Sequence, residues 1–257
     1  MSGPTVSAAY RAVVFDLFGT LIEFDASSLP ALRLGDVTVP STIPRYADLL
    51  RRYVPHVSAK QFAEALRAAS DTLRIECAES LIEPPSRLRF RRALERLACP
   101  PAVLDEAAVV LSRAHHDGIN SATVFPPERR AVLDHAAALG PVALVSNFDD
   151  TASAFAILAR HGILPALATV VVSEAVGLRK PHPVTLLTAL HGLGLEAADV
   201  LFVGDSLSAD VGVAHAVGAD AAWIDHGGEG VPPDVTPPRH VLRRLEDLHA
   251  VLDGARS

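Results

Sequence analysis

The chain has 257 residues, a formal net charge of −7, 49% hydrophobic residues and 21% charged residues. This composition is typical of a globular protein and excludes a disordered chain, and the negative charge gives no reason to expect nucleic acid or an anionic membrane as a partner. No apolar run reaches the roughly 18 residues of a membrane span, and the N-terminus lacks a signal-peptide pattern. The two cysteines, Cys77 and Cys99, lack metal-ligand spacing, so we expect free thiols in a reducing, cytoplasmic compartment.

The first predicted element is a buried strand at Ala12–Phe15, a short apolar run rich in β-branched residues. Asp16 follows at the end of this strand, and Gly19-Thr20 indicates a turn just beyond it. Open α/β sheets bind their ligands at the carboxyl ends of the strands, so Asp16 is a candidate catalytic residue. Taken alone, this residue could equally be a helix N-cap or a turn aspartate.

Residues 24–120 are predicted to form a mainly helical insert. Leu32–Val39 alternates around a Gly-Asp turn, which predicts a small hairpin. Helical periodicity begins at Arg45 and returns after Ser58, a predicted N-cap, and two further helices are expected at Leu88–Leu97 and Val103–His115. An apolar face on this insert is compatible with a monomer or a homodimer.

From residue 121 onward, predicted strands and helices alternate. The strands are expected at Val142–Val145, Ala168–Val172, Val200–Val203 and Ala221–Ile224. The helices are expected at Glu128–Leu139, Thr151–His161, Pro183–Leu193, Ala209–Val217 and Val241–Leu252. This alternation predicts the α/β class with a doubly wound parallel sheet. We expect residues 1–23 and 121–257 to form this core and residues 24–120 to form a separate domain.

Three later stretches carry polar side chains that fit a site around Asp16. Ser146-Asn147 follows the second strand, Lys180 precedes Pro181, and Asp205 and Asp210 follow the fourth strand. Together with the first stretch, AVVFDLFGTL, their order and separations resemble those of the haloacid dehalogenase-like superfamily, and the resemblance covers most of the chain. It implies a Rossmann-like core and a helical cap that closes over the nucleophile.

The resemblance also implies a role for each of these residues. Asp16 would be the nucleophile, and Mg²⁺ would be held by Asp16, Asp205, the backbone carbonyl of Phe18 and, less directly, Asp210. Two neighbouring carboxylates do repel each other unless a proton or a cation intervenes, and Mg²⁺ prefers oxygen ligands. The remaining candidates are the hydrogen-bond donors Thr20 and Ser146, the charge-compensating Lys180, and the substrate-contacting Asn147 and Phe18, the latter through its backbone N–H. Without the resemblance, turn, cap and surface roles would be the favoured interpretation of Thr20, Ser146 and Lys180.

Two motifs depart from the pattern in opposite directions. Phe18 occupies the place of the second aspartate of the family's phosphatases, whose general acid–base help is typically worth about 10² to 10⁴ in rate. The metal-independent L-2-haloacid dehalogenases carry an aromatic residue there. Asp205 instead stands where those dehalogenases have a Ser-Ser-Asn sequence, and a charged residue in a crevice needs a partner. Asp149 or Asp150 could supply the missing acid.

We therefore predict a Mg²⁺-dependent phosphohydrolase that acts on a small phosphorylated metabolite through an aspartyl-phosphate. One alternative is a metal-independent 2-haloacid dehalogenase that uses Asp16 as its nucleophile. The other is a non-catalytic protein that binds a phosphorylated ligand. The sequence does not identify the substrate.

Overall fold

The computed structural model describes residues 10–254, which fall into two compact units. The first, called the sheet unit here, contains the residues up to Glu23, Phe125–Asn147 and the residues from Leu158 onward. The second, called the helical unit, contains Phe24–Val124 and Phe148–Ile157. None of the helices within residues 10–254 combines the length and the apolar character needed to cross a membrane.

The sheet unit is built on six strands that pair in parallel in the order β10-β9-β8-β1-β6-β7. Their bounds are β1 Ala12–Phe15, β6 Val142–Ser146, β7 Thr169–Val172, β8 Val200–Gly204, β9 Asp220–Ile224 and β10 His240–Leu242. Strand β1 lies between β6 and β8, so the predicted first strand is central. The predicted α/β fold class, with a parallel Rossmann-like sheet, is confirmed.

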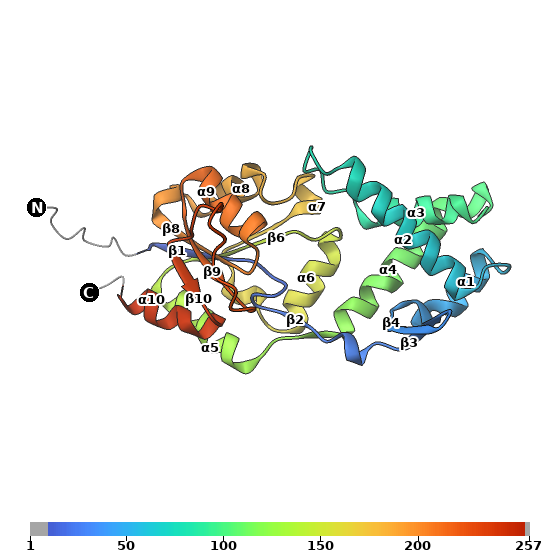
Figure 1. The fold of residues 1–257 in the computed structure, drawn as a ribbon, viewed down its shortest axis with the longest axis horizontal. Helices are drawn as coiled ribbons and strands as arrows, with labels where there is room; N and C mark the ends of the chain where they lie inside the picture. The colour runs from blue at the N-terminus through green and yellow to red at the C-terminus, as the bar shows by residue number, and fades with distance from the viewer. Residues whose placement is uncertain (1–9, 255–257) are drawn as a thin grey trace, which may run out of the picture. The chain divides into compact units, whose positions relative to one another are not determined.

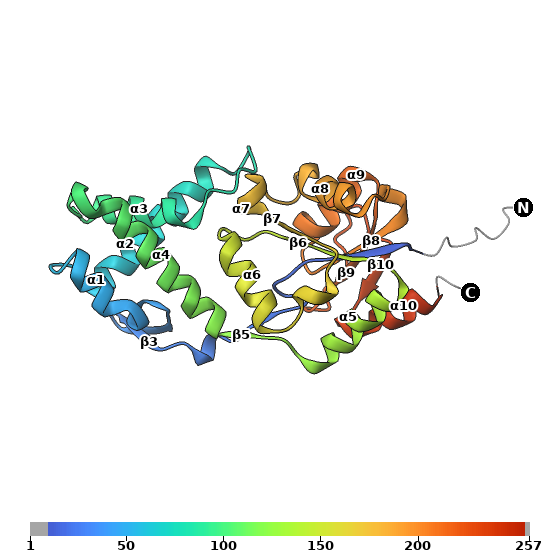
Figure 2. The ribbon, with the colours of Figure 1, turned by 180° about the vertical axis from the view of Figure 1, so that it is seen from behind.

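Helices cover both faces of this sheet (Figures 1 and 2). Helices α8 (Pro183–Leu193) and α9 (Gly212–Val217) pack on one face, where alternate residues of β1, Ala12 and Val14, join a buried apolar cluster. Helices α5 (Pro127–Leu139) and α10 (Leu248–Gly254) lie on the opposite side. Because side chains alternate across a strand, a strand buried on both faces needs a continuous apolar run, as β1 has.

The helical unit has its own apolar core. Its elements are β3 Ala31–Leu34, β4 Val37–Pro40, α1 Ala47–Tyr53, α2 Ala59–Glu76, α3 Ser86–Arg96 and α4 Leu104–Ser121. Ser58 and Gln61 form a capping box that starts α2, and the apolar face of that helix is buried against Phe90 and its neighbours. Strands β3 and β4 form the predicted hairpin. Where the chain passes between the units, β2 (Glu23–Phe24) pairs with β5 (Thr123–Val124).

The segment Phe148–Ile157 also belongs to the helical unit, although it directly follows β6 and includes most of α6 (Thr151–Arg160). The Ser86 N–H donates to the main-chain oxygen of Asp149 (2.8 Å), and the His116 ring lies 3.1 Å from the Asp149 carboxylate. These contacts join residues distant in sequence, so periodicity along the chain could not have placed the segment there.

The predicted helix at Val241–Leu252 is wrong in its first half. Residues His240–Leu242 form strand β10, which pairs in parallel with Ala222, Trp223 and Ile224, and α10 begins only at Leu248. The free edge of β9 provides a hydrogen-bonding partner for this segment. That pairing outweighs the local apolar spacing, which had suggested a helix.

Candidate active site

Three neighbouring strands deliver the candidate site residues to one edge of the sheet. Asp16 follows β1, Asp205 follows β8, and Ser146 is the last residue of β6. Asp210 lies five residues beyond Asp205, and each of the three aspartates offers a carboxylate oxygen within 4.8 Å of the others. The structure thus brings together the acidic residues that the sequence singled out.

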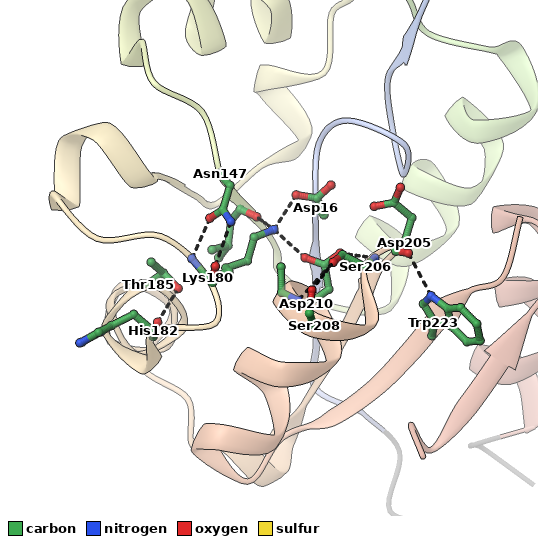
Figure 3. A network of polar contacts seen from close by, with 12 residues as sticks. Asp16, Asn147, Lys180, His182, Thr185, Asp205, Ser206, Ser208, Asp210 and Trp223 are labelled. Atoms are coloured by element: carbon green, nitrogen blue, oxygen red, sulfur yellow. Dashed lines mark hydrogen bonds and ion pairs between the residues drawn. The ribbon is translucent and has the colours of Figure 1, made fainter. Parts of the chain in front are cut away.

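Lys180 bridges two members of this group, Asp16 and Asp210 (Figure 3). Its Nζ donates to Asp16 Oδ1 (2.5 Å), to Asp210 Oδ1 (2.7 Å) and to the main-chain oxygen of Val145 (2.8 Å). An ammonium group has three donors, and all three are therefore used. The residue is 3% exposed, which excludes the alternative of a solvated surface lysine.

Asn147 holds the main chain of Lys180 in place. The Lys180 N–H donates to Asn147 Oδ1 (2.7 Å), and Asn147 Nδ2 donates to the Lys180 carbonyl (3.1 Å) (Figure 3). The amide of Asn147 thereby fixes the chain that carries the ammonium group. Sequence reasoning missed this positioning role, and the predicted contact of Asn147 with substrate stays a prediction.

Two glycines allow the backbone to approach the carboxylates closely. Gly19 has φ +81°, and a Cβ at this position would lie 2.1 Å from Asp205 Oδ2. A Cβ at Gly204 would lie 2.3 Å from the Asp210 carboxyl carbon. The π-helical turn Leu207–Val211 directs Asp210 back toward β8, where its Oδ2 accepts the Ser206 N–H (2.9 Å). Any larger side chain at either glycine would displace a carboxylate.

Two residues of the β9 region support the loops that carry the site, and sequence reasoning assigned neither a role. Trp223 Nε1 donates to the main-chain oxygen of Asp205 (2.9 Å), and His226 Nε2 lies 2.8 Å from the main-chain oxygen of Gly19. Trp223 stands in register with Gly204 on the neighbouring strand. Only the strand order, which was not predicted, could have revealed that pairing.

The site holds more negative than positive charge. Burial raises the pKa of Asp16 to about 7; the Lys180 charge opposes this shift, and Asp210 and Asp205 add to it. Burial likewise raises the pKa of Asp205, and the Asp210 carboxylate contributes. Burial alone would lower the pKa of Lys180, but its two carboxylate partners raise it overall. One lysine thus serves a cluster of three acids.

This donor set fits a small divalent cation. Three carboxylates with oxygens in close reach, and a deficit of positive charge, provide the hard oxygen ligands that Mg²⁺ prefers. The residues that could hold the ion are Asp16, Asp205 and Asp210. The Phe18 carbonyl, the fourth predicted ligand, stays a prediction.

The Thr20 hydroxyl is a buried donor that lacks a partner. The residue is fully buried, and within the described part of the chain its Oγ1 has no hydrogen bond. Leaving such a group unsatisfied typically costs about 1–3 kcal/mol, which a ligand acceptor could offset. Ser146, also buried, ends β6 beside the strand that delivers Asp16.

The surroundings of Asp149 disfavour the protonated form that a general acid needs. In the helical unit its carboxylate lies 3.1 Å from Arg89 Nη2 and 3.1 Å from His116 Nε2. Burial works to raise the pKa of Asp149, but the His116 hydrogen bond and the Arg89 charge outweigh it, so the pKa lies below its ordinary value. Asp150 accepts the Ser153 N–H (2.8 Å) at the start of α6, an ordinary capping role.

Comparison with known proteins shows the family and the fold. The family model of the haloacid dehalogenase-like hydrolases matches residues 10–218. A phosphoglycolate phosphatase of Yersinia pseudotuberculosis is 33% identical over 48% of this chain, which spans only 53% of that relative. A plasmid-encoded phosphoglycolate phosphatase of Cupriavidus necator is 30% identical over 98% of this chain and 97% of its own length. A 2-haloacid dehalogenase structure from Pseudomonas syringae has a TM-score of 0.72 at 22% identity, covering 95% of this chain and 99% of the other.

Proposed function

Because this chain belongs to the haloacid dehalogenase-like hydrolases, we propose that it is a Mg²⁺-dependent phosphohydrolase of small phosphate monoesters that works through an aspartyl-phosphate on Asp16. The observation that carries this proposal is a group of three neighbouring aspartates, two of which, Asp16 and Asp210, bond the same lysine. An anionic haloacid would be repelled by such a group, whereas a divalent cation would be attracted to it. Relatives named phosphatases support the same choice.

Asp16 performs the nucleophilic step in this proposal. Lys180 bonds its Oδ1, which orients the carboxylate and leaves Oδ2 as the attacking oxygen. Oδ2 forms a bond to phosphorus while the bond from phosphorus to the leaving oxygen breaks, and water then hydrolyses the resulting mixed anhydride. Bound Mg²⁺, held by Asp16, Asp205, Asp210 and the Phe18 carbonyl, would supply positive charge opposite the phosphoryl oxygens.

Hydrogen-bond donors then stabilise the phosphoryl group. The unpartnered Thr20 hydroxyl is the best candidate, and Ser146 is the second. Phe18 cannot protonate the leaving oxygen, and Asp149 is held ionised by Arg89 and His116. We therefore infer a substrate whose leaving group needs little protonation or takes its proton from water.

We further propose that the helical unit acts as the cap, as the family resemblance implies. This unit has its own buried core, so it can move as a body without unfolding. A cap that excludes water protects a mixed anhydride from premature hydrolysis.

A metal-independent 2-haloacid dehalogenase is the second candidate function. Phe18 favours it, since those enzymes carry an aromatic residue at this position. The two functions differ in their need for metal and in the ion that they release.

The test is phosphate release from a panel of alkyl and aryl phosphates, with Mg²⁺ and with chelator, alongside Asp16→Asn as the blank. We expect release that needs both Mg²⁺ and Asp16. Halide release from a 2-haloacid in chelator, with no phosphate release, would instead establish the dehalogenase. Phe18→Asp extends the test, because a restored acid should speed alkyl phosphates by about 10² or more and aryl phosphates much less.

A further inference from the structure

The helical unit contains a pocket of about 300 Å³ that no proposed catalytic step uses. Nine residues line it, among them two arginines, Arg67 and Arg89, and three hydroxyl residues, Ser41, Thr42 and Ser70. None of the nine is acidic. Three further lining residues, Ile43, Ala63 and Leu66, are apolar. Cationic and hydroxyl donors without carboxylates give the polar part of the pocket the chemistry of an anion site.

Arg89 is the most informative of these residues. Its Nη2 lies 3.1 Å from Asp149 Oδ2, so one part of the guanidinium is anchored. Its Nε is buried and has no hydrogen-bond partner in the described part of the chain. An unsatisfied buried donor on a charged group is more costly than one on a neutral group. Arg89 thus lines the pocket and also carries a charged N–H that has no hydrogen-bond partner in the described part of the chain.

The other groups at the pocket add donors without adding negative charge. Ser41 Oγ accepts the Ile43 N–H (3.2 Å), which leaves its hydroxyl hydrogen for a ligand. Arg67 is well exposed, and its Nε lies 3.9 Å from Asp71 Oδ2. At this distance the ion pair is weak, so the guanidinium can reorient toward a ligand. His115 lies 2.6 Å from Thr42 Oγ1, and burial lowers its pKa to about 3, so it is neutral near pH 7.

We propose that this pocket binds a small oxyanion, a carboxylate or a phosphate group, with Arg89 as its principal partner. This oxyanion has two possible sources: a second anionic group of the substrate, or a free anion that acts as an effector. If the source is the substrate, which rests on the proposed function, the substrate class is a phosphate monoester with a second anionic group. Phosphoglycolate, the compound in the relatives' names, has a carboxylate in that role.

The test of binding uses the full chain in chelator, so that it needs no catalysis. The Arg89 Nε–H resonance is followed by NMR during titration with acetate and, separately, inorganic phosphate. We expect a saturable shift at Arg89 and none at Arg91, which lies on the same helix and pairs with Asp105 and Glu95. Arg67→Gln should weaken the apparent affinity severalfold, whereas Arg91→Gln should leave it unchanged. The proposal would be overturned if the Arg89 Nε–H resonance did not shift with either anion.

Kinetics then identify the source. If the substrate supplies the anion, Arg89→Lys should raise KM for phosphoglycolate by about tenfold or more, because lysine lacks the planar donor fork, and leave KM for ethyl phosphate within twofold. If a free anion is the source, acetate should change the rates of both esters alike, and Arg89→Lys should abolish that effect. A shift at Arg89 without phosphate release from any ester would contradict the proposed function and leave the anion site standing.

Discussion

A buried and a partly buried carboxylate of this molecule, each paired with a cation, show opposite pKa shifts. Asp16 in the sheet unit bonds Lys180, yet its pKa is raised to about 7. Asp149 in the helical unit contacts Arg89 and His116, and its pKa is lowered. Burial acts in the same direction on both. Asp16 is the more deeply buried of the two, and they also differ in the number of charged neighbours of each sign.

Among residues 10–254, Lys180 is the one cation that bonds Asp16, and it also bonds Asp210, while Asp205 adds a third carboxylate. Asp149 has two basic partners, Arg89 and His116, the second of which also lies 3.9 Å from Asp150 Oδ2. A cation next to a carboxylate thus does not by itself keep the carboxylate ionised; the local balance of charge decides. The sheet unit has a deficit of positive charge that a ligand ion can fill, and the cluster at Asp149 has none.

Removing the lysine that Asp16 and Asp210 share should have the largest effect on stability. Lys180→Met leaves Asp16 and Asp210 buried without their partner, and we expect the free energy of unfolding to fall by about 3–5 kcal/mol. Chemical denaturation in chelator measures this loss. Lys60, the other lysine of the chain, is half exposed, so Lys60→Met should change stability by less than about 0.5 kcal/mol. Equal small effects for the two variants would contradict this account.

The pH dependence of stability should report the raised pKa of Asp16 in metal-free protein. The folded state holds the proton up to about pH 7, whereas the unfolded chain releases it near 4, so stability falls as pH rises between these values. The limiting slope is about 1.4 kcal/mol per pH unit. Denaturation at a series of pH values in chelator should show this slope for the unaltered chain and for Asp149→Asn. Asp16→Asn should show a shallower slope, because of the two acids only Asp205 then keeps a raised pKa; an unchanged slope in that variant would refute the assignment to Asp16.

Removing Asp210, which competes with Asp16 for Lys180, should lower the pKa of Asp16. In Asp210→Asn the charge of Lys180 serves Asp16 alone, so the pKa of Asp16 should fall by about one unit or more, equivalent to about 1.4 kcal/mol. Carboxyl ¹³C NMR titration in chelator measures the change. An unchanged or higher pKa of Asp16 would show that burial, and not competition for the lysine, sets its value.

The smallest effect is expected in the helical unit. Arg89→Gln removes one of two basic partners, so the pKa of Asp149 should rise toward its ordinary value, with a stability change of about 1 kcal/mol or less. Because the folded pKa of Asp149 is lowered, its contribution to stability is present above the unfolded pKa and is lost as pH falls through the folded pKa. Carboxyl NMR titration measures the shift, with Arg91→Gln as the control. No change at Asp149 would mean that His116 alone holds it ionised.

The sequence predicts the sheet and the acidic cluster well, because both depend on short stretches of neighbouring residues. Apolar runs such as Ala12–Phe15 indicate buried strands, and acids directly after two of them, Asp16 and Asp205, must meet if those strands are neighbours. The place of Lys180 in the site followed only from the family resemblance, and its bonds to Asp210 and to the Val145 carbonyl were not predicted. The roles of Asn147 and Trp223 were not predicted either, since they depend on the strand order and on the path of loops.

The errors have the same origin. Val241 and Leu242 begin an apolar pattern that is compatible with a helix. In the structure they form a strand instead, because they pair with the open edge of β9. Asp149 follows a core strand in sequence and yet belongs to the helical unit through contacts with residues more than 30 positions away. Long-range pairing of this kind leaves no mark on local periodicity.

A Mg²⁺ titration of the unaltered chain and of Asp205→Asn, followed by calorimetry, tests the central claim most directly. Asp205 does not bond Lys180. Its replacement should therefore reduce the excess of negative charge at the site and leave both carboxylate partners of Lys180 in place. The account predicts one saturable Mg²⁺ site in the unaltered chain and at least about tenfold weaker binding in Asp205→Asn, since ligand charge sets affinity. Absence of Mg²⁺ binding, or equal affinity in the two proteins, would contradict the claim that these carboxylates form a cation site.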